Sequence, residues 1–310
     1  MRRPLLALLA LASSCAAGCG GEPGPPKDPL VEARAADARG DREAVRAKLE
    51  AAEALDDERG RVATTWRLQV ALTGGDVPAA LARLRRIVER FQGRGEDARG
   101  RTYDARLLAE VVVRAAAEGA RERVEGPAPH AEHARRLLTA GREALALGGD
   151  DDEEGRALLD RAGAWVALGD GPMAPRLADA GIPAGKGPLV VVVADPFEMG
   201  EPVLPSVLRR WARSLSVVLA GRPTGEVRVG IRRVKATPEE ERAVMAEAAR
   251  RAGVRFAGVL AEEAPLALGL ADAGAAVLVI GPDDRLAGRV AGRSLDPRAL
   301  DDLVARLAGR

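Results

Sequence analysis

The sequence predicts a mixed protein in which an all-helical region precedes a domain of alternating strands and helices. Between residues 28 and 180, apolar residues recur at helical spacing and strand signals are few. From residue 187 onward, short Val-rich runs alternate with amphipathic stretches, as in α/β domains. The most distinctive run, Val190–Val193, ends at Asp195 and leads into a helical pattern. Such a run is typical of a buried strand that feeds a helix.

Charge and composition argue against nucleic-acid binding. The 47 Lys and Arg residues are balanced by 46 Asp and Glu residues, and aromatic residues make up only 2% of the chain. Nucleic-acid interfaces need basic patches and aromatic stacking platforms. The two cysteines, Cys15 and Cys19, precede residue 20. The rest of the chain therefore lacks thiols for redox chemistry or metal binding, and we expect no cofactor.

Residues 1–18 have the layout of a secretory signal peptide. Two arginines precede a short apolar run, which is too short to span a bilayer, and small residues then lead to Cys19. A Gly/Pro-rich stretch over residues 19–27 predicts a flexible tether.

The tetrapeptide AAGC that ends at Cys19 resembles the lipobox of bacterial lipoproteins, in which cleavage occurs before a cysteine that receives lipid. The resemblance implies lipidation of Cys19, with Cys15 as a weaker candidate. It also implies a periplasm-facing, lipid-anchored protein of the cell envelope, and Gly20 favours the outer membrane. The alternative is an ordinary cleaved signal peptide with incidental cysteines.

Helix breaks recur at a fixed period in residues 28–180. Asp41 and Asp76 each follow glycine and lie 35 positions apart, and each opens a helix with Ala and Leu at matching places. The two stretches, GDREAVRAKLEAAEAL and GDVPAALARLRRIVERF, resemble tetratricopeptide repeats. We expect about two such units. An irregular helical bundle with Asp caps remains the alternative.

The region from 187 to 310 predicts a regular order of elements. We expect a strand over Leu189–Ala194, a helix over 202–219 and a strand over Val227–Val234. A capped helix from Thr237 to Ala252 follows, then an extended piece over Val254–Leu260 and a short helix over Ala264–Leu270. The region ends with a hairpin of Ala275–Ile280 and Leu286–Val290, whose turn is at 281–284, and a last helix from Ser294.

This β-α-β-α-β-β-α order resembles the thioredoxin fold, in particular the TlpA/ResA-like periplasmic domains. The stretch GVRFAGVLAEEAPLALGLADAGAAVLVIGPDDRLAGRVAGRSLDPRALDDLVARL carries the resemblance best. The family places Trp-Cys-x-x-Cys after the first strand and a cis-proline before the hairpin strand. Here the corresponding positions are Phe197, Glu198, Met199, Gly200 and Glu201, with Ala275 at the proline position. Without thiols, the domain is expected to be redox-inactive.

Two other sets of side chains could carry chemistry. His130 and His133 lie three apart at a predicted helix start, but a zinc site would need a third protein ligand and none is indicated. Glu198 and Glu201 could act as acid and base, although carboxylates near a helix N-terminus are favourable without catalysis.

The sequence therefore predicts a membrane-anchored module that binds a protein or peptide, or acts as a scaffold, rather than an enzyme. The alternatives are an enzyme that uses carboxylates or a histidine-bound metal, and a structural protein of the envelope.

Overall fold

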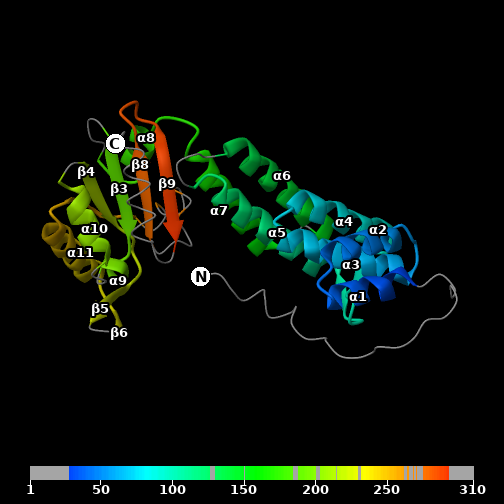
Figure 1. Ribbon diagram of the computed structural model, residues 1–310. Coiled ribbons are helices and arrows are strands. Elements are labelled where there is room, and N and C mark those ends of the chain that lie inside the picture. The colour runs from blue at the N-terminus through cyan, green and yellow to red at the C-terminus, as the bar shows by residue number, and fades with distance from the viewer. Residues whose placement is uncertain are drawn as a thin grey trace. The chain divides into compact units, whose positions relative to one another are not determined.

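The computed structural model describes residues 28–125, 130–149, 151–183, 188–199, 203–213, 215–229, 232–261 and 275–292, with residues 264, 268 and 270. The chain divides into two compact units. The first comprises the described chain up to Ala116 with Thr139–Arg156, and the second comprises Ala117–Leu138 with the chain from Ala157. Both helices and a mixed sheet are present, so the predicted mixture of α and β structure is confirmed (Figure 1).

Four helices open the first unit as two helical hairpins (Figure 1). Helix α1 (Pro29–Ala38) packs against α2 (Arg42–Glu53), and α3 (Glu58–Thr73) packs against α4 (Val77–Arg90). Helix α2 also contacts α3, so the two hairpins stack on each other.

The two helical hairpins turn in the same way. Gly40 and Gly75 have φ values of 72° and 73°, a left-handed conformation that glycine adopts without steric cost. The following Asp41 and Asp76 donate their N–H groups to the carbonyl five residues earlier, at 3.0 and 2.8 Å. Each carboxylate accepts the N–H three residues later at 3.0 Å, which caps the second helix. The 35-residue period of the sequence therefore corresponds to two turns of the same conformation.

A short β-hairpin that the sequence did not predict follows α4. Strands β1 (Arg94–Glu96) and β2 (Thr102–Asp104) pair antiparallel. The buried carboxylate of Asp97 closes their loop: it accepts two backbone N–H groups, Arg101 Nε at 2.8 Å and the Tyr103 hydroxyl at 2.8 Å. These bonds stabilise strands that are too short to show a periodic pattern.

Three longer helices contribute residues to both units. They are α5 (Ala105–Glu122), α6 (Ala131–Gly148) and α7 (Glu153–Ala167). A short helix, α8 (Met173–Asp179), follows in the second unit. The Asp152 carboxylate caps α7 by accepting the Gly155 N–H at 2.9 Å. Glu153 and Glu154 give the helix an acidic first turn, which the helix dipole favours.

The second unit contains a five-stranded sheet in the order β7-β4-β3-β8-β9. The central strand β3 (Leu189–Ala194) is parallel to β4 (Ser216–Gly221) and antiparallel to β8 (Ala275–Ile280). Strand β7 (Arg255–Val259) runs parallel to β4, and β9 (Leu286–Gly292) is the hairpin partner of β8. The predicted strands over 189–194, 254–260 and the final hairpin are therefore confirmed.

Two predicted elements are wrong in extent. The helix expected over 202–219 ends early, as α10 (Val203–Trp211), and residues 216–221 form β4 instead. Val217 and Val218 continue a helical apolar spacing, but they are β-branched and pair with the central strand.

The strand expected over 227–234 is a hairpin of β5 (Glu226–Val229) and β6 (Arg232–Lys235). The predicted run contains a glycine, which favours turns over strand interiors.

Helix α11 (Pro238–Ala252) begins as the sequence predicts. The Thr237 hydroxyl accepts the Glu240 N–H at 3.3 Å, and the Glu240 carboxylate accepts the Thr237 N–H at 2.8 Å. This reciprocal pair is the predicted capping box. The final helix from Ser294, most of 264–270, and residues 1–27 with both cysteines lie outside the described residues.

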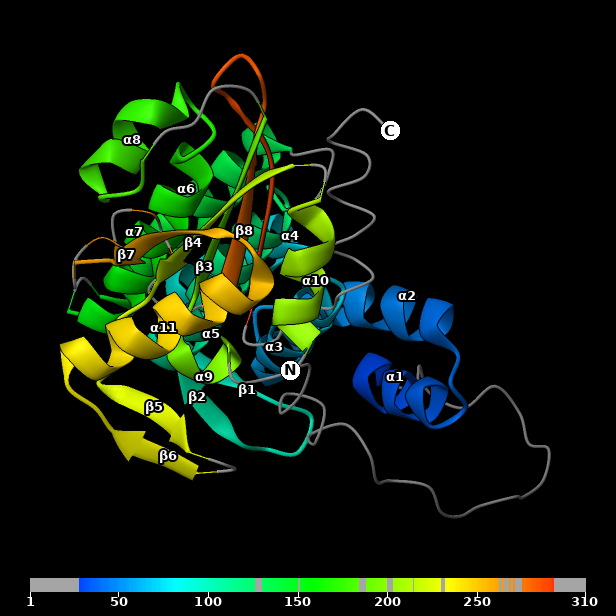
Figure 2. The ribbon, with the colours of Figure 1, turned by 90° about the vertical axis from the view of Figure 1, so that its left-hand side faces the viewer.

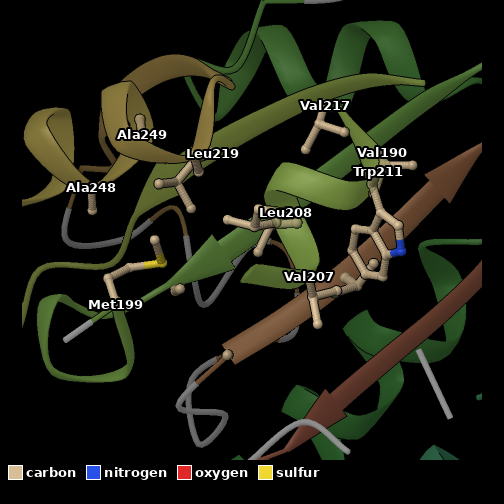
Figure 3. Close-up of a cluster of buried hydrophobic side chains, with 14 of the residues drawn as sticks. Val190, Met199, Val207, Leu208, Trp211, Val217, Leu219, Ala248 and Ala249 are labelled. Atoms are coloured by element: carbon tan, nitrogen blue, oxygen red, sulfur yellow. The ribbon is translucent and has the colours of Figure 1, made fainter. Parts of the chain in front are cut away.

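One face of the sheet forms the core of the second unit with α10 and α11. Alternate strand residues point to this side, and Leu208 and Trp211 of α10 pack onto them (Figure 3). The cluster comprises Val190, Val192, Ala194, Met199, Val207, Leu208, Trp211, Val217, Leu219, Met245, Ala248, Ala249, Ala252, Ala275, Val277 and Val279.

Candidate functional site

The loops that follow β3 and β4 lie at one edge of the sheet, because these strands are parallel. The Arg222 N–H donates to the Ala194 carbonyl at 2.8 Å, and the Leu260 N–H donates to the Gly221 carbonyl at 2.7 Å. Asp195, the first residue after β3, is buried. Binding sites of open α/β sheets commonly occur at the carboxyl ends of parallel strands. We call this region the carboxyl edge.

The predicted thioredoxin-site positions begin directly at the carboxyl edge. The short helix α9 (Pro196–Met199) follows β3, and the backbone of Phe197 and Glu198 belongs to it. The side chains of these two residues lie outside what the structure describes, as do Gly200 and Glu201 entirely.

Met199 and Ala275 complete the predicted set, and both are buried. Met199 is 5% exposed and belongs to the apolar core, where its side chain fills space rather than forming a surface (Figure 3). Ala275 is 2% exposed and pairs opposite Ala194 in the register of β3 and β8. The register therefore places the start of β8 beside the end of β3, from which α9 follows.

A buried carboxylate that sequence reasoning missed stands near this edge. Glu241 of α11 is 2% exposed, and its Oε1 accepts the Thr224 N–H and hydroxyl, both at 2.9 Å, and the Glu226 N–H at 3.2 Å. The carboxylate thereby ties the start of β5 to the first turn of α11. In the sequence it is one of three consecutive glutamates, and only its helical spacing from Met245 indicates the buried face.

We call β5 and β6 together the basic ribbon. It carries four basic side chains and one acid, and all four residues of β6 are exposed. Val229 is 61% exposed and Val234 is 44% exposed. Helices α9 and α11 both contact β5, so the ribbon adjoins the carboxyl edge (Figure 2). This surface offers positive charge, apolar side chains and strand backbone.

The two histidines lie elsewhere in the second unit. His130 and His133 are exposed and line a surface depression with Glu132 and Arg136. Glu132 forms an ion pair with Arg136. Among the residues that the structure describes, no three or more potential His, Cys, Asp or Glu ligands gather as a metal site.

A buried arginine is the second feature that sequence reasoning missed. Arg289 of β9 is 2% exposed, and its guanidinium lies 4.9 Å from the ring centroid of Trp165. It donates to the carbonyls of Val124 at 3.2 Å, Val166 at 3.3 Å and Trp165. The carbonyls of Trp165 and Val166 belong to the last turn of α7, where a helix lacks internal donors and a cation is favourable, and Val124 lies just beyond the end of α5. Burial lowers the pKa of Arg289 to about 10, so the group is charged at neutral pH.

Glu125 lies beside this arginine. Burial raises the pKa of its carboxyl to about 7, Arg121 and Arg289 act in the opposite direction, and Glu122 adds to the rise. Perturbed carboxyls also occur in structural charge networks. Because Arg289 bonds to backbone carbonyls of two helices, we assign this cluster to the attachment of β9 rather than to chemistry.

A second attachment joins the β8–β9 turn to α8. Both carboxylate oxygens of Asp284 accept the Ala174 N–H, at 2.9 and 3.1 Å, and its carbonyl accepts the Met173 N–H at 2.7 Å. Asp284 has a φ of 59°, which aspartate tolerates better than most residues.

Comparison with known proteins adds no identification. No family model matches the chain, and no characterised protein or solved structure shows significant similarity to it. Across the part of the chain that the structure describes, no helix is both long and apolar enough to cross a bilayer.

Proposed function

We propose that the protein is a lipoprotein of the bacterial cell envelope that is anchored through Cys19 and faces the periplasm. Its C-terminal domain would be thioredoxin-like and redox-inactive, and would bind a protein or peptide. The carboxyl edge is the observation that supports this best. There α9 follows the central strand at the place of the family's redox motif, in a chain without cysteine beyond residue 19.

The order of elements supports the thioredoxin-like part of the proposal. Strand β3 leads into α9 and α10, and the parallel strands β4 and β7 lie on one side of it. The antiparallel hairpin β8–β9 lies on the other side. The resemblance to TlpA/ResA-like domains rests on this order of strands and helices and on the closing hairpin.

The equal turns of the first unit support tetratricopeptide-like units. The turns before α2 and α4 share their glycine conformation, their backbone hydrogen bond and their aspartate cap. Stacked helical hairpins of this kind form extended surfaces that commonly bind peptides.

The anchor is tested by partition between water and a detergent phase. Wild-type protein and a Cys15→Ser variant should enter the detergent phase, whereas Cys19→Ser should remain in water. If Cys19→Ser still entered the detergent phase, the assignment of the anchor would be wrong.

The binding role is tested in cells with the full-length chain. Cutting the chain near residue 185 would remove Arg289 and Asp284 from the helices that they hold. A photo-crosslinking amino acid is therefore placed at one exposed valine at a time, Val229 in the basic ribbon and Val70 on α3. A specific adduct from Val229 would assign binding to the thioredoxin-like domain, and one from Val70 would assign it to the helices. No specific adduct from either position would contradict a binding function.

A further inference from the structure

We propose that β6 is a docking edge for an extended acidic segment of a partner protein, which adds to the basic ribbon as a third, antiparallel strand. This inference rests on the proposed binding function and specifies the surface and the chemistry of the partner. Strand addition at an open edge is an established mode of peptide recognition.

The register of the ribbon shows which backbone groups point outward. The Ala236 N–H donates to the Gly225 carbonyl at 2.9 Å, so these two residues form a hydrogen-bonded pair of the ladder. In an antiparallel ladder such pairs alternate, so Val234 and Arg232 direct their backbone groups toward β5. Arg233 and Lys235 therefore direct theirs to the opposite side, away from β5.

The two edges of the ribbon differ in what surrounds them. On the β5 side, α9 and α11 make contact, and Glu241 accepts the outward-directed N–H of Glu226. On the β6 side, all four residues of the strand are exposed. A strand with exposed outward-directed N–H and C=O groups is a template for pairing with another chain.

The side chains of β6 define the partner. Arg233 and Lys235 point to one face of the ribbon together with Arg228 and Glu226, whereas Val234 and Arg232 share the other face with the two valines of β5. An added strand would place its alternate side chains beside these two sets. The matching segment has acidic residues at every second position and apolar residues between them.

The basic side chains of β6 disfavour the alternative partner, a second copy of this chain. Two β6 strands would bring basic side chains opposite each other, which is destabilising. Arg233 forms an ion pair with Glu226 at 3.5 Å, but both side chains are largely exposed. Such surface pairs contribute little, so a carboxylate of the partner can compete for Arg233.

The experiment measures binding of a labelled, end-capped heptapeptide of alternating Glu and Val to the full-length Cys19→Ser protein by fluorescence anisotropy. We expect the Arg233→Glu/Lys235→Glu variant to bind at least about tenfold more weakly, and wild-type affinity to fall as salt rises. The matched control is Arg42→Glu/Arg46→Glu, which reverses two exposed charges on α2 and should bind as the wild type does.

Backbone methylation of the peptide tests the strand geometry without altering the protein. In antiparallel pairing, the N–H groups of the Glu residues would donate to the carbonyls of Arg233 and Lys235, whereas those of the Val residues would point away from β6. We expect N-methylation of the Glu residues to abolish binding and N-methylation of the Val residues to be tolerated. Equal effects of the two modifications, or the reverse order, would overturn the proposal.

Two further outcomes separate this inference from the proposed function. If the basic ribbon bound vesicles containing anionic phospholipid but not the peptide, the surface would be a membrane contact and the inference would be wrong. If Val229 yielded a protein adduct in cells and the charge-reversed variant retained that adduct, a partner would exist but would not dock on β6.

Discussion

Replacing Glu125 by glutamine is expected to remove a pH dependence from the stability of the second unit. The pKa of this carboxyl rises from 4.5 to about 7 because the group is buried, against the opposing effect of Arg121. A change of this size corresponds to at most roughly 3 kcal/mol of unfolding free energy. Because the folded pKa is raised, the folded chain retains a proton that the unfolded chain releases near pH 4.5. Stability therefore declines as the pH rises from about 4.5 to about 7 and stays at the lower level above it.

The assay is urea unfolding followed by circular dichroism, from about pH 5 to about pH 8, with Glu125→Gln compared with the wild type at each pH. The difference in unfolding free energy between the two proteins should grow with pH. The wild type loses stability as the pH rises, whereas glutamine does not titrate. Glu118→Gln is the matched control, since this exposed glutamate of α5 is not among the groups that shift the pKa of Glu125, and the variant should keep the wild-type pH dependence. A difference between Glu125→Gln and the wild type that stays constant over this range would refute the reasoning.

Three further predictions concern stability. Arg289→Met should lower the unfolding free energy of the second unit by about 2–4 kcal/mol, because three carbonyls lose a charged donor; urea unfolding measures this, and a loss below about 1 kcal/mol would contradict the assigned attachment. Asp41→Ala and Asp76→Ala should each cost about 1 kcal/mol, as lost helix caps do; thermal melts should show similar losses, and clearly unequal ones would argue against equivalent turns. Leu208→Ala should cost about 2–5 kcal/mol because the side chain is 0% exposed; a nearly neutral result would place Leu208 outside the core.

Much of the second unit could be predicted because its elements carry strong local signals. The apolar runs of β3 and β8 and the capping box at Thr237 each identify an element without reference to the rest of the chain. The start of β4 carried no such signal, since Val217 and Val218 fit a helix by spacing and a strand only through their pairing with β3. The strands beside Asp97 depend on side-chain bonds that a periodic pattern does not show.

The candidate site could be predicted only in part. The ends of β3 and β8 at the carboxyl edge could be predicted because both strands are strongly patterned, whereas the short helix α9 was not predicted. Glu241 and Arg289 were missed because charged residues on amphipathic elements are usually exposed. The buried guanidinium of Arg289 is hydrogen-bonded to carbonyls up to 165 positions earlier in the chain. A local sequence pattern does not indicate a contact of such long range.

The bonds of Arg289 and Asp284 also determine when the protein can finish folding. The donor on β9 and its acceptor at Val124 are separated by 165 positions, and Asp284 is separated from Ala174 by 110. During synthesis, the carbonyls near the ends of α5 and α7 lack their arginine donor until the β8–β9 hairpin emerges, more than a hundred residues later. Contacts of such long range slow folding. A chain that ended before β9 would therefore lack the arginine that bonds to the carbonyls of Val124 and Trp165.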